Sequence, residues 1–62
     1  MNEYRQERLS RLCLIWVGLT KQQRGWLRLF ADVKSMTPLA LVEQVAKDEH
    51  VTYDVAIELI LS

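Results

Sequence analysis

Apolar residues recur every three or four positions along most of this chain, and no stretch alternates apolar and polar residues over the length of a strand. A spacing of three to four residues is that of one face of an α-helix. Breaks in the pattern divide the chain into four predicted helices, at about residues 2–17, 21–34, 38–49 and 53–61. The sequence therefore predicts an all-α fold, a compact four-helix single domain over residues 1–62 whose last two helices cross as a helix-turn-helix-like pair.

Threonines mark where three of these helices begin. Thr20 and Gln23 have the spacing of a capping box, in which each side chain accepts a hydrogen bond from the other residue's backbone. Thr37 precedes the only proline, which favours the first position of a helix. Thr52 follows a short turn at residues 50–51 and is expected to cap the last helix. Gly18 stands where a helix end favours a residue able to adopt positive φ.

Each predicted helix carries an apolar stripe that we expect to face the core. The second helix also contains Gly25, which costs about 1 kcal/mol relative to alanine; we expect a neighbouring tryptophan to pack against its bare backbone. The expected core positions, helix by helix, are Leu9, Leu12, Trp16 and Leu19; Trp26, Phe30 and Val33, flanked by Leu27 and Leu29; Leu39, Val42, Val45 and Ala46; Val55, Ala56, Leu59 and Ile60.

The predicted helices also contain apolar residues that lie outside these stripes. Leu14, Ile15 and Val17 lie off the stripe of the first helix, and Ile57 and Leu61 lie off that of the last. Exposed apolar clusters mark binding surfaces, so these five residues are predicted to contact a partner. A symmetric homodimer is one expected partner, because pairing would cover the apolar first helix.

Charge is divided unevenly along a chain whose net charge is zero. Residues 1–34 carry a net charge of +4, and residues 35–62 carry −4. The division fits a surface that faces a polyanion, two halves that attract each other, or two copies that pack head to tail. If nucleic acid is bound, the expected phosphate contacts are the arginines of the first two helices, Arg5, Arg8, Arg11, Arg24 and Arg28.

Residues that carry chemistry are few. Cys13 is the only cysteine and is expected to be a small buried side chain, which fits a reducing, cytoplasmic location; the alternative is an intermolecular disulfide or a reactive thiol. His50 is the only histidine, and we expect it to occupy a turn. Asp48 and Glu49 precede it directly, so the three side chains point in different directions on a helix. We therefore expect no enzyme activity, no cofactor and no metal. The longest apolar run has eight residues, well short of a membrane span.

The last two predicted helices resemble known families over about twenty residues. Ala46, the turn at 50–52, Ala56 and Leu59 resemble the helix-turn-helix of DNA-binding proteins, in which a small residue lets two helices cross closely. The same stretch resembles the end of ubiquitin-associated domains, without their Met-Gly-Phe/Tyr loop, and the helices of ribbon-helix-helix repressors, without their basic strand. The last helix offers Asp54 and Glu58 where a recognition helix offers basic or amide side chains.

These patterns predict a small, non-enzymatic helical module that acts through protein–protein interaction. The alternative is a small helix-turn-helix-like DNA-binding transcription regulator, whose DNA contacts would come from the arginines named above. No membrane partner is expected.

Overall fold

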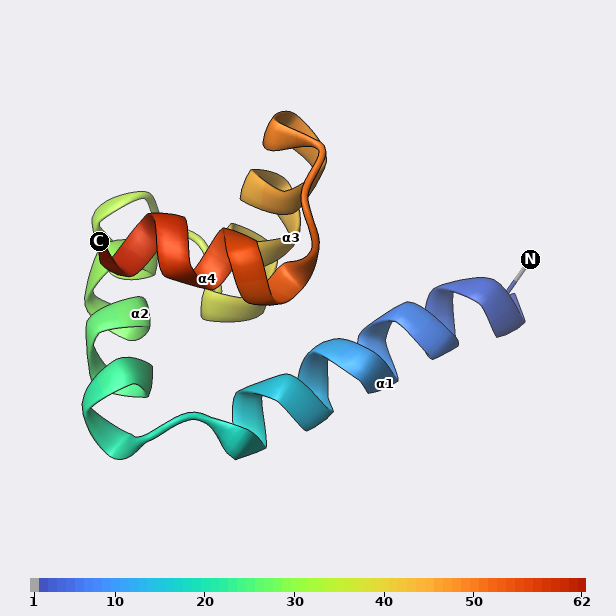
Figure 1. Ribbon diagram of the computed structural model, residues 1–62, viewed down its shortest axis with the longest axis horizontal. Helices are drawn as coiled ribbons and strands as arrows, with labels where there is room; N and C mark the ends of the chain where they lie inside the picture. The colour runs from blue at the N-terminus through green and yellow to red at the C-terminus, as the bar shows by residue number, and fades with distance from the viewer. Residues whose placement is uncertain (1) are drawn as a thin grey trace.

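The computed structural model describes residues 2–62, with side chains from residue 10 onward. It contains four helices, α1 (Asn2–Gly18), α2 (Lys21–Val33), α3 (Pro38–Glu49) and α4 (Tyr53–Leu61), and no strand in the described part (Figure 1). The predicted all-α four-helix fold is confirmed. The observed helix ends differ from the predicted ones by one residue at the end of α1 and one at the end of α2.

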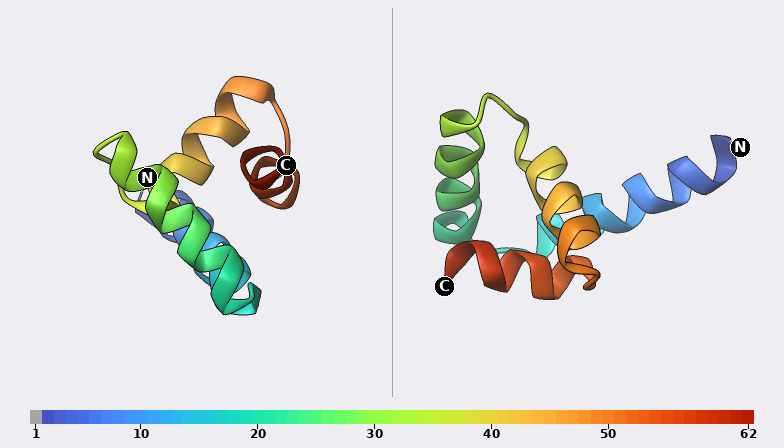
Figure 2. Two further views of the ribbon diagram at one scale, coloured as in Figure 1. Left: turned by 90° about the vertical axis from the view of Figure 1, so that its left-hand side faces the viewer. Right: turned by 90° about the horizontal axis from the view of Figure 1, so that it is seen from above.

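The helices form a compact cluster from which the start of α1 projects. The pair α3 and α4 is the most closely associated, and the two helices run in clearly different directions (Figure 1). The second half of α1 lies along α3 and α4, whereas its first half extends beyond the other helices (Figure 1 and the right-hand view of Figure 2). The short connections after α1, α2 and α3 hold the four axes at these different angles.

All three predicted threonine caps are present. The Thr20 hydroxyl oxygen accepts a hydrogen bond from the Gln23 backbone N–H at 3.1 Å, and the Gln23 side-chain oxygen accepts one from the Thr20 N–H at 2.9 Å. Thr37 accepts a bond from the Ala40 N–H at 3.1 Å, and Thr52 accepts one from the Val55 N–H at 3.4 Å. Each cap satisfies a backbone donor that the first turn leaves unpaired, and so fixes where α2, α3 and α4 begin.

Two helices end at residues in the left-handed region, and neither residue is glycine. Ser35 has φ of 57° after α2, and His50 has φ of 55° after α3. In both places the next N–H bonds back to the helix, from Met36 to the Ala31 carbonyl at 2.9 Å and from Val51 to the Ala46 carbonyl at 3.0 Å. These are Schellman ends. His50 thus occupies the expected turn, whereas the prediction for Gly18 is wrong, because no glycine has positive φ in the described residues.

The core lies where all four helices meet. Six buried residues form one cluster: Leu12, Leu27, Val42, Ala46, Ala56 and Ile57. Ala46 and Ala56 supply the small side chains that the sequence predicted for a close crossing of α3 and α4. Around the cluster pack partly buried residues that include Ile15, Trp16 and Leu19. Burial of each leucine or isoleucine in this cluster stabilises the fold by about 1.5–3 kcal/mol.

The predicted inward face of α2 is wrong except for Leu27, which was expected to flank it and lies in the core. Leu27 and Ala31 are fully buried, whereas Val33 lies largely in solvent, Trp26 is about half exposed and Phe30 is partly buried. The helix carries apolar residues on two sides, and only one side can face three other helices. The side with the smaller residues, Leu27 and Ala31, lies against the core, because helices whose axes approach closely leave room only for small side chains.

Smaller corrections concern α1, α3 and α4. On α4, Val55 and Leu59 are exposed and Ile57 is buried, so the helix is rotated from its predicted orientation. On α3, Leu41 joins Val42 and Ala46 in the core, and Leu39 and Val45 are only partly buried. The expectation of a buried thiol at Cys13 is also wrong, because this side chain is exposed. Leu9 lies outside the described side chains.

Candidate interaction surface on α2

Among the described side chains, α2 carries more large exposed apolar residues than any other helix. Trp26, Leu29 and Val33 have 47%, 51% and 78% of their surface in solvent. Their spacing of three and then four residues places them in one row, as in the a and d positions of a coiled-coil seam. We call these three residues the α2 outer face. A row of this kind is the pattern by which one helix packs against another.

Gly25 lies beside this row and has no partner in the chain. Apart from its two chain neighbours and the backbone of its own helix, no described atom lies within 4 Å of a Cβ atom built at Gly25. The expected packing of a tryptophan on this bare backbone is therefore not made by Trp16 of the same chain. The glycine leaves α2 without a side chain at one exposed position next to Trp26, where the backbone of another helix could approach closely.

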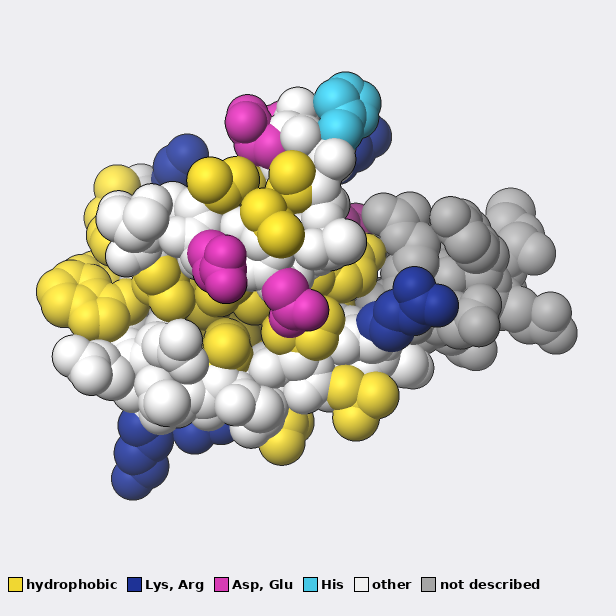
Figure 3. Space-filling model, viewed as in Figure 1, with side chains coloured by type: hydrophobic (Ala, Val, Ile, Leu, Met, Phe, Trp, Pro, Cys, Tyr) yellow, Lys and Arg dark blue, Asp and Glu magenta, His cyan; other side chains and the backbone are white. Residues whose placement is uncertain are grey.

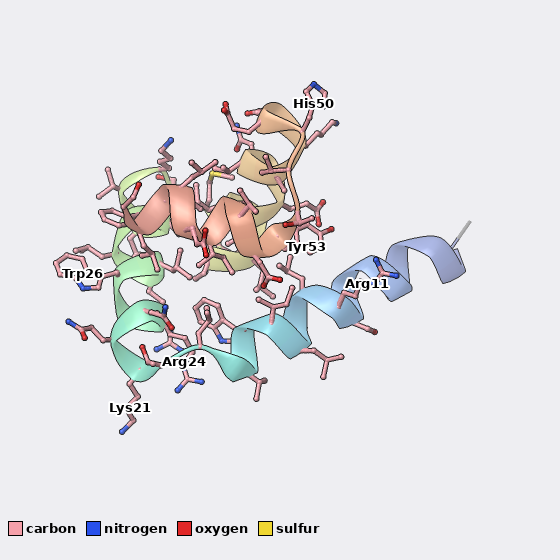
Figure 4. All side chains as sticks on the ribbon, in the orientation of Figure 1. Arg11, Lys21, Arg24, Trp26, His50 and Tyr53 are labelled. Carbon is pink, nitrogen blue, oxygen red and sulfur yellow. The ribbon has the colours of Figure 1, made fainter. Side chains whose placement is uncertain are left out.

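Trp26 stacks on Phe30, one turn further along α2. The ring centroids lie 5.9 Å apart, and the ring planes make an angle of 25°. Trp26 points away from the helix cluster (Figure 4). The two rings line a hollow of about 380 Å³ together with Leu61, Gln22 and Gln23. The end of α4 therefore extends the apolar surface of the α2 outer face around one side of the helix.

A second hollow begins on the other side of Phe30. It has a volume of about 290 Å³, and its walls come from α2, α3 and α4. Its lining residues are Phe30, Val33, Lys34, Leu41, Val45 and Ile60. Because Phe30 borders both hollows and Val33 belongs to the outer face, the apolar row and the two hollows form one continuous surface. The sequence did not identify this surface, because it assigned Trp26, Phe30 and Val33 to the core.

The five predicted partner residues fall into three groups. Leu14 and Val17 are 75% and 70% exposed on α1, and they make a smaller apolar patch of their own. Leu61 is partly buried and borders the first hollow. Ile15 is partly buried against the core, and Ile57 belongs to the core, so Ile57 does not lie on the surface where the sequence placed it.

The described basic residues of the first two helices are spread over both helices. Arg11 lies midway along α1, while Lys21 and Arg24 lie at the start of α2 (Figure 4). Arg28 has its guanidinium carbon 5.6 Å from the centre of the Trp16 ring, which is a cation–π contact between α2 and α1. Arg5 and Arg8 lie outside the described side chains.

Acidic side chains gather on the last two helices (Figure 3). Carboxylates stand out on the face that α3 and α4 present (Figure 3). Asp54 and Glu58 of α4 are both exposed. Within the described side chains, they make no ion pair with Lys21, Arg24 or Lys34. Ion pairing between the ends of α2 and α4 therefore does not account for the division of charge along the sequence.

Nothing in the described side chains resembles a metal centre. No three histidine, cysteine, aspartate or glutamate side chains gather there closely enough to hold an ion. His50 is exposed at the α3–α4 turn, and Cys13 is exposed on α1. In the described part of the chain, no helix combines the length and apolar character that a membrane span requires.

Comparison with known proteins adds no relative to this description. No protein-family model, curated protein sequence or solved structure matches the chain significantly.

Proposed function

We propose that this chain is a small non-enzymatic binding module, which engages a helix of a protein partner through the α2 outer face. One observation carries the proposal. Trp26, Leu29 and Val33 form a helical row of large apolar side chains in solvent, continuous with two apolar hollows. An apolar surface of this shape is typical of a helix-in-groove interface.

The energetics favour occupation of this surface. An exposed leucine- or valine-sized side chain gains about 1.5–3 kcal/mol when it is fully buried. Tryptophan is enriched among the residues that dominate binding energy. Trp26 is held by its stack on Phe30, so its ring loses little further freedom when a partner covers it. Loss of side-chain freedom is one of the main costs of binding.

The experiment compares three forms of the chain as bait in a lysate of the cells that make it. Leu29→Glu places a charge in the centre of the α2 outer face without touching the core. Gln44→Glu adds the same charge at an exposed position of α3 and serves as the matched control. We expect the wild type and Gln44→Glu to retain the same protein, and Leu29→Glu to lose it. Equal retention by all three forms would contradict the proposal.

The helix-turn-helix resemblance suggests the alternative, DNA binding. The exposed surface of α4 argues against base readout, because Asp54 and Glu58 would approach a polyanion. Phosphate contacts would instead have to come from the arginines of α1 and α2. Retention on DNA-cellulose at low salt separates the two functions. Strong retention that falls steeply with salt would favour DNA, and the effect of Arg11→Ala and Arg24→Ala would then locate the contact.

A further inference from the structure

Two exposed apolar surfaces of opposite charge lie on different helices. The first is the α2 outer face, which lies between Lys21 at the start of α2 and Lys34 just after its end. Within α2 and its C-cap residue, four basic residues outweigh the single Asp32. A helix that binds this surface well therefore presents apolar side chains together with carboxylates.

The second surface is the solvent side of α4, and it has that chemistry. Val55 and Leu59 are exposed there, one turn apart, and Asp54 and Glu58 each directly precede one of them. We call these four residues the α4 outer face. The helix contains no basic residue. Inside one molecule this surface is turned away from the core, because Ala56 and Ile57 occupy the inward side of α4.

We infer that a second copy of this chain occupies the α2 outer face, and that it binds with its α4 outer face. In this head-to-tail contact, the carboxylates of one copy lie near the lysines of the other, and Val55 and Leu59 cover the row of Trp26, Leu29 and Val33. The inference rests on the proposed function of the α2 outer face and names one partner for it. Such a contact would also place the basic first half of one copy, residues 1–34, near the acidic second half of the other, residues 35–62.

Charge exchange tests this contact directly. The first variant, Lys21→Glu with Lys34→Glu, makes the α2 surface acidic. The second, Asp54→Lys with Glu58→Lys, makes the α4 surface basic. Among the described side chains, none of these four exposed residues makes a side-chain hydrogen bond or an ion pair, so both variants should fold, which circular dichroism checks. A matched control, Gln44→Glu with Ala40→Glu, adds the same kind of charge on the outer side of α3.

Sedimentation velocity over micromolar to millimolar concentrations supplies the readout. We expect the wild type and the control to associate, and each charge-exchanged variant alone to associate about tenfold more weakly, because exposed pairs contribute modestly. Mixing the two variants should restore association, since the acidic α2 of one then meets the basic α4 of the other. Raising the salt concentration should weaken wild-type association by screening the charges, while the contribution of the apolar contacts remains.

Three results would overturn the inference. A wild type that stays monomeric throughout removes the second copy as the occupant. Association that neither variant weakens, or that mixing does not restore, places the contact elsewhere, for example on Leu14 and Val17 of α1. None of these results decides the lysate experiment. If the chain does not associate with itself, Leu29→Glu can still abolish capture of a different protein from the lysate. Failure of the head-to-tail contact is therefore distinguishable from failure of the proposed function.

Discussion

Trp26 and Phe30 stack one turn apart on α2, with ring centroids separated by 5.9 Å, yet the two rings have different environments. Phe30 is partly buried between two hollows, and Trp26 stands in solvent at the edge of the first. The stack therefore joins the packed side of α2 to its exposed side. This relationship makes Trp26 an oriented surface residue, and it sets α2 apart from an ordinary amphipathic helix, whose solvent side is polar.

The first prediction concerns which α2 residue stabilises the fold. Leu27→Ala should lower the free energy of unfolding by about 2–5 kcal/mol, because it opens a cavity in the core. Trp26→Ala should cost clearly less, since about half of the ring already lies in water. Urea denaturation followed by circular dichroism compares the two. A larger loss from Trp26→Ala would mean that α2 is rotated from the orientation described.

Gly25→Ala should have opposite effects on stability and on binding. Beyond its neighbours on the same helix, no described atom would contact the added methyl group, so the free energy of unfolding should rise by about 0.5–1 kcal/mol. The same methyl group should weaken association if another helix approaches α2 closely at this point. Thermal unfolding and sedimentation on the same sample measure both. A destabilised variant would contradict the open space seen beside Gly25.

The left-handed residue at the end of α3 gives a third prediction. His50→Gly should raise the free energy of unfolding by about 1 kcal/mol, because glycine adopts positive φ without the steric cost of a side chain. Gln44→Gly, in the exposed middle of α3, is the control and should lower stability by about 1 kcal/mol. Destabilisation by both substitutions would show that the His50 side chain contributes more than its backbone conformation costs.

The cation–π contact between Arg28 and Trp16 provides a fourth prediction, on the attachment of α1. Arg28→Ala should cost about 0.5–1 kcal/mol, which in a domain of this size shifts the thermal midpoint by roughly 2–8 °C. Arg28→Lys should recover part of the loss. Arg11→Ala removes an exposed arginine from α1 and should change the midpoint little. Equal shifts for Arg11→Ala and Arg28→Ala would indicate a general charge effect.

Local signals were sufficient to predict the helices, because the chemistry that starts a helix is local. Thr20, Thr37 and Thr52 each bond to a backbone N–H three residues away, and this spacing is visible in the sequence. The left-handed residue after α2, Ser35, could not be predicted in this way, since serine rarely adopts positive φ. The end of α1 was misread for the converse reason, because Gly18 can adopt positive φ but does not.

Rotation of each helix about its axis could not be predicted in the same way. On α2, both the row of Trp26, Leu29 and Val33 and the side of Leu27 and Ala31 are apolar, and the pattern favoured the larger residues. The choice depends on how closely the other helices approach, which is a property of the whole fold. On α4, Ile57 and Leu59 exchanged their predicted environments for the same reason. The residues of the proposed binding surface were therefore predicted from the sequence to lie in the core.

The emission of Trp26 tests the central claim, that the α2 outer face is the binding surface, most directly. In a Trp16→Phe background Trp26 is the only tryptophan, and phenylalanine keeps a ring beneath Arg28. Emission at micromolar concentration should be that of a half-exposed ring, and it should shift to shorter wavelength as the chain associates, in step with the sedimentation mass. With Leu29→Glu added, both changes should disappear. A rising mass with constant Trp26 emission would contradict the claim.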